Sequence, residues 1–576
     1  MKERIMNMNK TFKKMLSLVI ALAMVMAMGL TAFAEEAPTY TITITKDSTD
    51  KADHTYGAYQ IFKGDLAEEN GKKTLSNIQW GDNVTSATAI TELMKIEAFS
   101  DLPADASAAT VAKAISDANL TNDSAGAKAI ADAFAAAVTS PKKTVNIAAD
   151  KTSGEITGLA AGYYLVKDTA AVSGEGASTR YILEVVSDVS VTEKANVPSV
   201  TKKVKEKNDT TNATTNWQDA ADYDIGDEID YKLEGTLPSE FAVFKKYTVY
   251  KFTDELSAGL TYKADSAKVV LNTENGTDIT GLFDISVSGQ ILTVSLKNGT
   301  DLRADERFTK DSKIIVLYKA TLNESAKLGS EGNPNEVKLE FSNNPNWNDE
   351  GTPESGETPK DKVIVFTYEI KALKVEPTSD AAITQEDYDA LTDTEKANYV
   401  KVGEKYQKTQ ALNGAGFTLY KKVNETYVAV GEEIKDTTTF EFKGTDAGKY
   451  KLVETTVPTG YNKAEDIEIE VTATYDTDSA DSKLTGLTVT PKTAGFVVES
   501  TNTTTGEGAD AVTTTTYSGV ISGKVLNQKG ATLPSTGGMG TTLFYVFGAI
   551  LVLGGGVVLI SRRRMGTESD NVSDRK

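Results

Sequence analysis

Polar side chains at six positions share strand faces with apolar residues, and their types suit one kind of chemistry. Neighbouring residues of a β-strand point to opposite faces, so residues two positions apart point the same way. By this spacing Lys202 lies on the face of Val200 and Val204, and Lys374 lies on the face of Ile370. Acids and asparagines stand on apolar faces in the same manner. The full set is Lys202, Asp254 and Asn335 in one part of the chain and Lys374, Glu454 and Asn527 in the next.

Two explanations fit a lysine and an acid on the inner face of a domain. An unpaired buried charge is unfavourable, so the simpler explanation is a buried ion pair, or a strand end where the charge reaches water. The other explanation is an isopeptide bond between the Lys and the Asn. Burial lowers the pKa of a Lys and raises the pKa of an acid, which leaves a neutral amine beside a neutral carboxylic acid. The acid then polarises the Asn carbonyl and moves protons, the amine attacks, and ammonia leaves.

Nearby residues could take some of these roles in the middle of the chain. Lys203 could replace Lys202, although these adjacent residues point to opposite faces. The asparagine has three alternatives, which are Asn333, Asn343 and Asn344. The strand faces favour Lys202 and Asn335.

The N-terminal part of the chain carries a similar lysine and acid. Lys46 follows the alternating run 40–45, and Asp168 ends the run 162–168. No Asn near the end of this part lies clearly on an apolar face. We therefore expect no isopeptide bond there and interpret Lys46 as a lysine at a strand end.

Strands must position most of these residues. Thr and Val are abundant from residue 39 onward, and Gly, Asn and Asp mark the turns. The clearest alternating runs are 40–45, 247–252, 314–322, 363–375 and 467–471. Residues 85–138 are instead Ala-rich with helical spacing, and residues 385–399 form a short charged segment. The sequence predicts an all-β protein of tandem sandwich domains, with a helical insertion in the first domain and a short helix in the last.

Changes in composition divide the chain into β-domains. Residues 195–198 form one boundary, and residues 343–360, which are rich in Asn, Pro, Gly and Glu, form another. We expect domains at 36–195, 196–345 and 361–530. A weak internal repeat connects the first and third domains, because Gly-Tyr-Tyr-Leu-Val-Lys-Asp at 162–168 parallels Gly-Lys-Tyr-Lys-Leu-Val-Glu at 448–454.

The N-terminus has the parts of a secretory signal. Lysines precede an apolar, uncharged run at 15–30, and an Ala-Phe-Ala cleavage site follows at 32–34. We expect a signal peptide at 1–34 and a mature chain that starts at Glu35. A permanent membrane anchor is the alternative, but the run is short and ends in small residues.

Three elements follow one another at the C-terminus. The first is the pentapeptide Leu533, Pro534, Ser535, Thr536 and Gly537. Residues 543–560 then form an uncharged run just long enough to span a bilayer. Arginines at 562–564 favour the cytoplasmic side of the membrane. A permanent tail anchor is the alternative to a processed signal.

Composition argues against several classes of function. The chain has 61 Lys+Arg against 82 Asp+Glu and a formal net charge of −21, whereas nucleic-acid binders carry basic patches. It has no Cys, which excludes disulfides and thiolate metal sites. His54 is the single His, so a histidine metal cluster is impossible within one chain, and we expect no cofactor. No triad motif surrounds His54. A carbohydrate-active enzyme needs only two carboxylates, but the chain has three Trp and no paired-acid motif.

The C-terminal order resembles the cell-wall sorting signal of Gram-positive surface proteins. In that family a sortase cuts between the Thr and the Gly of the LPxTG motif, here Thr536 and Gly537, and passes the Thr carbonyl to an amine. The resemblance implies a precursor held transiently in the membrane and a mature protein joined to peptidoglycan, outside a Gram-positive cell.

The order Lys, acid, Asn resembles that of isopeptide-forming domains in Gram-positive pilins. Residues 197–204, 252–262 and 335–345 look like the fimbrial middle domain with an Asp catalyst, and 450–461 looks like the pilin E-box. The resemblance covers nearly the whole mature chain. It implies immunoglobulin-like domains of the Cna-A and Cna-B (SpaA-like) types. It also implies bonds from Lys202 to Asn335 and from Lys374 to Asn527, with Asp254 and Glu454 as catalysts.

The same family implies a lysine that joins subunits. In backbone pilins it lies at the end of the first domain, often in a Val-Tyr-Pro-Lys setting, and the sorting Thr of the neighbouring subunit is joined to it. Lys194 occupies this place, although Thr192 and Glu193 stand where the family has Tyr and Pro. A solvated linker lysine is the alternative interpretation of Lys194, and Lys202 and Lys203 are nearby competitors.

The sequence therefore predicts a sortase-assembled major pilin, the shaft subunit of a covalent fibre that supports adhesion. The expected partners are a sortase, neighbouring pilin subunits, peptidoglycan, minor or tip pilins and a host surface ligand. The protein would not be a turnover enzyme, because each isopeptide bond forms once. The alternative is a monomeric, wall-anchored adhesin of the same domains, with a partner site in the helical insertion.

Overall fold

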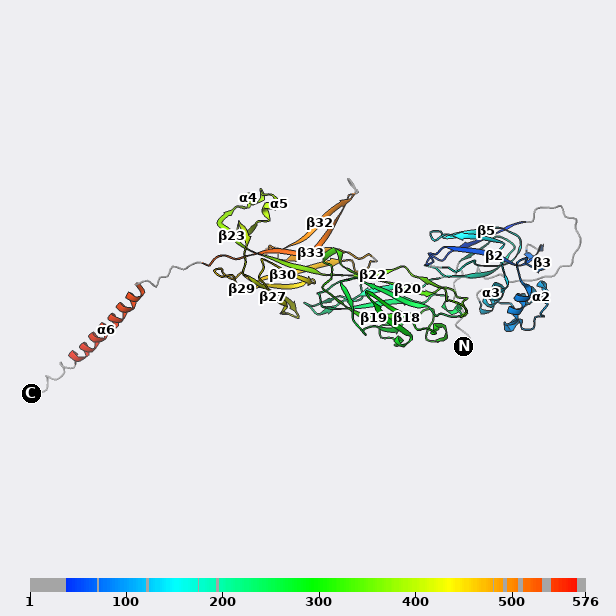
Figure 1. Ribbon diagram of the computed structural model, residues 1–576, viewed down its shortest axis with the longest axis horizontal. Coiled ribbons are helices and arrows are strands. Elements are labelled where there is room, and N and C mark those ends of the chain that lie inside the picture. Colours follow the sequence, from blue (N-terminus) through cyan, green and yellow to red (C-terminus); the bar gives the residue numbers. More distant parts are fainter. Residues whose placement is uncertain are drawn as a thin grey trace, which may run out of the picture.

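Three β-sandwich domains follow one another along an elongated molecule (Figure 1). The structure is a computed structural model, and the residues that it describes are 38–69, 72–120, 124–172, 174, 176–192, 196–479, 481–490, 495–505, 511–530 and 540–566. The expected signal peptide at 1–34, Lys194 and the pentapeptide at 533–537 lie outside the described residues.

The first domain contains two sheets. One has the order β5-β1-β8, and the other has the order β3-β2-β6-β7 with β4 paired to β2. Their bounds are β1 (Tyr40–Thr45), β2 (His54–Glu69), β3 (Lys72–Trp80), β4 (Lys143–Ile147), β5 (Ser153–Leu159), β6 (Gly162–Asp168), β7 (Arg180–Val185) and β8 (Val189–Thr192). Ile42 and Ile44 of β1 are fully buried against Tyr164 and Val166 of β6, so the alternating run at 40–45 closes the sandwich.

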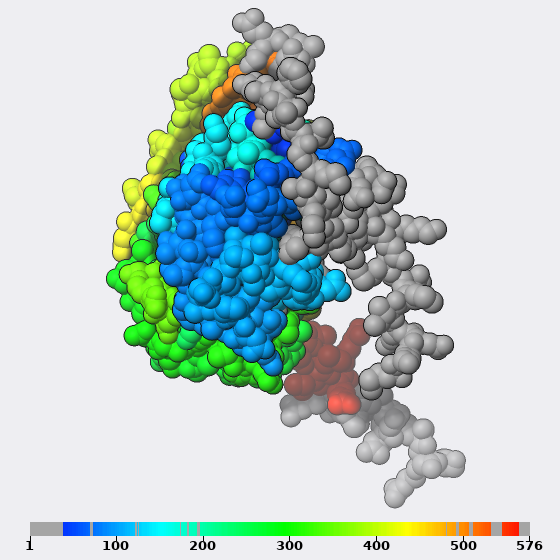
Figure 2. All heavy atoms as spheres, turned by 90° about the vertical axis from the view of Figure 1, so that its right-hand side faces the viewer, coloured from blue at the N-terminus to red at the C-terminus, as the bar shows by residue number. Residues whose placement is uncertain are grey.

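Helices cover the second of these sheets. They are α1 (Ser86–Met94), α2 (Ala108–Asp117) and α3 (Ala125–Ala137), with a short 3₁₀ turn at Glu97–Phe99. The Ser107 and Ser124 side chains accept backbone N–H groups at the starts of α2 and α3, which satisfies donors that a helix end leaves free. Apolar residues such as Val111 and Phe134 pack onto Phe62 of the sheet. The helical insertion predicted at 85–138 is confirmed. The first domain lies at the end of the molecule that faces the viewer in Figure 2.

The second domain is also a two-sheet sandwich. One sheet has the order β15-β19-β13-β9 with β16 paired to β19, and the other has the order β12-β22-β20-β14-β18-β17 with β21 paired to β20. The first sheet consists of β9 (Val200–Val204), β13 (Glu228–Thr236), β15 (Leu260–Tyr262), β16 (Lys268–Leu271) and β19 (Lys313–Leu322). The second consists of β12 (Ala220–Asp222), β14 (Tyr250–Leu256), β17 (Phe283–Ser288), β18 (Ile291–Leu296), β20 (Asn333–Ser342), β21 (Ser355–Glu357) and β22 (Asp361–Phe366). A small hairpin pairs β10 (Lys207–Asn208) with β11 (Ala213–Thr214).

The second domain extends past the boundary expected from the sequence. Strand β22, which the sequence places at the start of the third domain, pairs antiparallel with β20 and parallel with β12. The sheet of the second domain thus continues to Phe366, past the end expected at 345 and into the segment expected to begin the third domain at 361. Val363 and Val365 pack in the core of the second domain, whereas Ile364 and Phe366 pack against the core of the third. Each face of β22 thus serves a different domain.

The third domain pairs a six-stranded sheet with a five-stranded sheet. The first has the order β24-β25-β23-β33-β32 with β28 paired to β23, and the second has the order β27-β26-β29-β30-β31. The first sheet consists of β23 (Tyr368–Ile383), β24 (Tyr399–Val402), β25 (Lys405–Ala411), β28 (Thr439–Thr445), β32 (Val497–Thr505) and β33 (Val512–Leu526). The second consists of β26 (Gly416–Val423), β27 (Thr426–Lys435), β29 (Gly448–Thr456), β30 (Ile467–Tyr475) and β31 (Leu484–Thr490).

Two short helices belong to this domain, and a long helix follows it in the chain. The charged segment predicted at 385–399 contains α4 (Gln385–Asp389) and α5 (Asp393–Lys396), each with a capping box at its start. Helix α6 (Gly540–Gly566) contains Phe544–Arg563, which is long and apolar enough to cross a membrane. Phe544 is 82% exposed and Val552 is 76% exposed, so this helix carries a bare apolar surface suited to lipid.

Candidate functional site

In the second domain, Lys202, Asp254 and Asn335 meet between the two sheets. Strand β9 belongs to one sheet, and β14 and β20 pair with each other in the opposing sheet. The Nζ atom of Lys202 lies 2.6 Å from Oδ1 of Asp254. Lys202 also donates to the Tyr318 hydroxyl at 2.9 Å, and Nδ2 of Asn335 donates to the same hydroxyl at 2.7 Å. Lys202, Asp254 and Asn335 are all 0% exposed.

The surroundings of this cluster favour uncharged side chains. Burial lowers the pKa of Lys202 to about 8. Burial also raises the pKa of Asp254, although Lys202 opposes that rise. The rings of Tyr231 and Tyr318 stack with centroids 5.2 Å apart, and Nζ of Lys202 lies within 5.3 Å of both. Oδ2 of Asp254 and Oδ1 of Asn335 make no hydrogen bond within the described part of the chain, so an ion pair alone leaves this buried group incompletely satisfied.

In the third domain, Lys374, Glu454 and Asn527 form a second cluster. Strands β23 and β33 run parallel with Lys374 opposite Val525, which brings Asn527 beside the lysine. The Nζ atom of Lys374 donates to Oδ1 of Asn527 and lies 2.8 Å from Oε1 of Glu454. Nδ2 of Asn527 donates to the same Oε1 at 2.8 Å, and Oε2 of Glu454 accepts the backbone N–H of Ala464 at 2.6 Å.

This second cluster is as enclosed as the first. Lys374 is 0% exposed, and Glu454 and Asn527 are each 1% exposed. The Phe417 ring lies 5.1 Å from Nζ of Lys374. Burial lowers the pKa of Lys374, and Glu454 opposes that change. Each of the two domains therefore encloses an amine, an acid and a carboxamide in its core, with direct contacts among all three in the third domain and a link through the Tyr318 hydroxyl in the second.

Sequence comparisons match three parts of the chain to known domain families. The family of the Gram-positive pilin backbone subunit 2, Cna-B-like domain matches residues 225–345, and the SpaA family, a prealbumin-like fold domain, matches 398–485. The LPXTG cell wall anchor motif matches 526–565. The "Trypsin-resistant surface T6 protein" of Streptococcus pyogenes serotype M6 is 28% identical over 425 residues, which are 64% of this chain and 70% of that protein. The chain thus carries domains of Gram-positive backbone pilins and is homologous to them.

Solved pilin structures are similar to this chain over most of its residues. The T6 backbone pilin of serotype M6 Streptococcus pyogenes is 18% identical, with a TM-score of 0.45 over 87% of this chain and 100% of that one. The full-length major pilin SpaD of Corynebacterium diphtheriae is 15% identical, with a TM-score of 0.41 over 87% and 99%. The assignment rests on the sequence matches, and the anchor match with α6 gives a cell-wall location on the bacterial surface.

In the first domain of the pilin, Asp168 contacts a histidine rather than Lys46. Oδ1 of Asp168 lies 2.9 Å from Nδ1 of His54, and Oδ1 of Asp50 lies 3.1 Å from Nε2 of the same ring. Lys46 donates instead to the backbone carbonyl of Ala52. Burial is the main cause that raises the pKa of Asp168. The structure therefore does not bring Lys46 and Asp168 together.

The alternative residues considered for the second-domain bond are engaged elsewhere. Nδ2 of Asn333 donates to two backbone carbonyls at 3.0 and 3.1 Å. Nδ2 of Asn343 donates to two carbonyls of the first domain at 2.7 and 3.1 Å. Asn344 accepts a backbone N–H at 2.9 Å, and Nζ of Lys203 lies 2.6 Å from Oδ1 of Asp219. Lys202 and Asn335 remain the pair that contacts the acid and the tyrosine.

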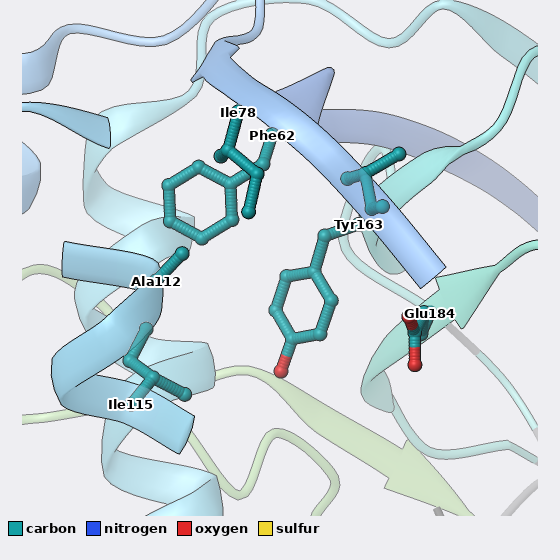
Figure 3. Close-up of a pocket in the computed structure, with 7 residues that line it drawn as sticks. Phe62, Ile78, Ala112, Ile115, Tyr163 and Glu184 are labelled. Atoms are coloured by element: carbon teal, nitrogen blue, oxygen red, sulfur yellow. The ribbon is translucent and has the colours of Figure 1, made fainter. Parts of the chain in front are cut away.

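A small cavity lies between the helices and the sheet of the first domain (Figure 3). Its lining consists of Phe62, Leu75, Ile78, Ala112, Ile115, Tyr163 and Glu184. The cavity has a volume of about 30 Å³, which is the space of one water molecule. It is a packing gap, so it gives no support to a ligand site in the helical insertion.

Sequence reasoning missed two buried polar residues near the domain cores. Tyr318 shares a face of β19 with Val316, and its hydroxyl was hidden in an otherwise apolar run. Lys421 shares a face of β26 with Leu419 and is buried, so the same spacing rule could have found it. Its partner Asp224 lies 197 positions away in another domain, and no local pattern announces that contact.

Proposed function

We propose that this pilin is the shaft subunit of a covalent fibre, in which Thr536 of one subunit is joined by a sortase to Lys194 of the next. The anchor match, the elongated row of domains and the family assignment support this role. The final subunit would be joined to peptidoglycan. Minor or tip pilins and a host surface ligand would be further partners.

The proposal includes one internal isopeptide bond in each of the second and third domains. The observation that carries it is a buried lysine in contact with an acid in both cores, with the asparagine in direct contact in the third domain and linked through the Tyr318 hydroxyl in the second. The neutral amine of the lysine attacks Cγ of the asparagine, and a new C–N bond forms. The bond from Cγ to Nδ2 breaks, and that nitrogen leaves as ammonia after it gains the proton that the amine loses. The acid carries protons and is unchanged at the end, so each bond forms once and the protein is not a turnover enzyme.

The bonds would connect strands near the two ends of each domain. Lys202 lies in β9, the first strand of the second domain, and Asn335 lies in β20 near its end. Lys374 and Asn527 are separated by 153 positions. A pulling force along the fibre would pass through each bond and bypass the residues between its ends. The domains would then resist extension and proteolysis, because unfolding cannot draw out the enclosed chain.

Burial and ion pairing make the two lysines that compete with Lys194 less available for joining subunits. Lys202 is 0% exposed inside the second domain, so its amine is not accessible to another subunit. Lys203 is held by Asp219 at 2.6 Å, although its side chain is 27% exposed. Lys194 itself lies outside the described residues, between Thr192 and Asn196.

Polymerisation in a Gram-positive host with a pilin sortase tests the shaft role. The account predicts a ladder of covalent multimers that Thr536→Ala and Lys194→Arg both abolish. Lys203→Arg is the matched control and keeps the ladder. Monomers joined to the wall without a ladder would contradict the shaft role and favour the adhesin of the same domains.

A further inference from the structure

The acids of the two clusters differ in how far they reach. Oε1 of Glu454 contacts both reactants, with Lys374 Nζ at 2.8 Å and Asn527 Nδ2 at 2.8 Å. Asp254 is one methylene shorter and contacts Lys202 at 2.6 Å. Its other oxygen, Oδ2, has no hydrogen-bond partner within the described residues. The acid of the second domain thus holds the amine but not the carboxamide.

The hydroxyl of Tyr318 occupies the place that the shorter acid leaves. It accepts a hydrogen bond from Nζ of Lys202 at 2.9 Å and one from Nδ2 of Asn335 at 2.7 Å. Those two nitrogens are the attacking atom and the leaving atom of the proposed bond. In the third domain the corresponding link is made by Glu454 alone, and the ring beside the lysine there is Phe417, which has no hydroxyl.

We propose that Tyr318 is a catalytic residue of isopeptide formation in the second domain, where Asp254 and Tyr318 together perform the role that Glu454 performs alone in the third. This inference rests on the proposed function. When Lys202 Nζ has attacked Cγ of Asn335, Nδ2 becomes basic and must gain a proton before it leaves. The hydroxyl gives its proton to Nδ2 and takes one from Nζ, so Tyr318 is regenerated. The Nζ–Cγ bond forms, the Cγ–Nδ2 bond breaks, and ammonia carries away the transferred proton.

The environment of the hydroxyl suits a relay that never holds a charge. Tyr318 is 2% exposed, and burial raises its pKa well above the ordinary value. A free phenolate is therefore unfavourable, and both proton movements must occur together. Tyr231 provides a matched comparison, because it stacks on Tyr318 and lies 5.2 Å from Nζ of Lys202. Its hydroxyl makes no hydrogen bond of normal geometry within the described residues, although the nearby Asn335 side chain opposes the rise that burial causes in the pKa of Tyr231.

The test compares Tyr318→Phe with Tyr231→Phe in the mature chain by intact mass and by mapping of the crosslinked peptides. Each bond lowers the mass by about 17 Da. We expect Tyr318→Phe to slow formation of the second-domain bond by roughly 10²-fold, the usual contribution of a positioned proton carrier. Tyr231→Phe should keep the bond. The third-domain bond should be complete in both variants and serves as an internal control of folding and export.

A second variant separates catalysis from packing. Adding Asp254→Glu to Tyr318→Phe lengthens the acid so that it can reach Asn335, as Glu454 reaches Asn527, and we expect it to restore the second-domain bond. A second-domain bond formed at the normal rate in Tyr318→Phe overturns the inference. If Tyr318→Phe loses the second-domain bond and Asp254→Glu does not restore it, Tyr318 has only a packing role, and the inference is also overturned. Absence of both bonds from the unaltered chain would instead refute the proposed function.

Discussion

The Nζ atom of Lys421 lies 2.6 Å from Oδ2 of Asp224, although the two residues belong to different domains. The same amine lies 2.9 Å from Asp209 of the second domain and 2.8 Å from Asp446 of the third. The Lys421 side chain is only 4% exposed. Unlike the lysines of the two clusters, Lys421 faces several carboxylates, and these raise its pKa instead of letting burial lower it. It is thus a charged clamp between domains, whereas Lys202 and Lys374 are the proposed nucleophiles.

Replacing Lys421 by Met should loosen the joint between the second and third domains. The change leaves the acids around it without their cation, and removal of one partner of a buried ion pair costs about 3–5 kcal/mol. Chemical denaturation of the mature chain measures the loss, and small-angle X-ray scattering measures bending at the joint. Lys422→Met is the control, because Lys422 pairs with Glu425, whose side chain is 81% exposed. Equal stability of the two variants would refute the clamp.

The same joint, where Glu206 and Asp222 of the second domain face Tyr475 of the third, should weaken as the pH rises. Burial and the neighbouring Asp222 raise the pKa of Glu206 to about 9. The ordinary pKa of this carboxyl is near 4.5. Between that pH and about pH 9, the folded protein therefore keeps a proton on Glu206 that the unfolded chain has lost. The stabilisation is therefore complete at low pH and is lost as the pH rises towards about 9. Urea midpoints measured from about pH 5 to about pH 9 should fall, and Glu206→Gln should flatten this dependence. A urea midpoint that rises with pH would contradict this prediction, and so would the same pH dependence in Glu206→Gln as in the unaltered chain.

Loss of the third-domain bond should lower thermal stability without removing the ion pair beside it. Asn527→Ala leaves Lys374 and Glu454 2.8 Å apart but removes the acyl group that the lysine would attack. A crosslink across 153 positions stabilises by about 5 kcal/mol in the chain-entropy account. Calorimetry should show a lower melting temperature for the third domain. Asn502→Ala, on the exposed strand β32, is the control, and equal melting of both variants would show that no crosslink was present.

His54→Leu should destabilise the first domain, because it leaves two buried acids without their shared partner. The change removes the ring nitrogens that lie 2.9 Å from Asp168 and 3.1 Å from Asp50, and both carboxyls stay buried. We expect a loss of about 1–3 kcal/mol at neutral pH, the cost of leaving buried polar groups without their hydrogen-bond partner. The loss should shrink in acid, where protonated carboxyls no longer repel each other. Urea unfolding of the first domain at both pH values measures the difference. A loss that is equal at the two pH values would point to packing rather than charge.

The period-two spacing of strands was enough to select the six cluster residues. Lys202 and Lys374 stood out because lysine is rarely fully buried, so its presence on an apolar face was informative. Tyr318 gave no such signal, since a tyrosine on an apolar face is ordinary. The contacts between distant residues, such as Lys421 with Asp224 or His54 with Asp168, depend on how the domains and sheets meet.

The boundary of the second domain could not be predicted for a related reason. Strand β22 is apolar on both faces because Val363 and Val365 serve one core and Phe366 serves the other. The alternating run at 363–375 therefore continues in sequence across a change of domain, and Thr367 separates β22 from β23. Pairing partners, rather than the pattern of the strand itself, decide to which sheet such a strand belongs.

The most direct test of the account is the intact mass of a recombinant fragment of residues 35–531. Each isopeptide bond releases one ammonia and lowers the mass by about 17 Da. The account predicts a deficit of two bonds, of which Asp254→Ala removes the one in the second domain and Glu454→Ala the one in the third. Peptide mapping should find Lys202 joined to Asn335 and Lys374 joined to Asn527. A fragment with its full sequence mass would contradict the account, because both clusters would then be buried ion pairs.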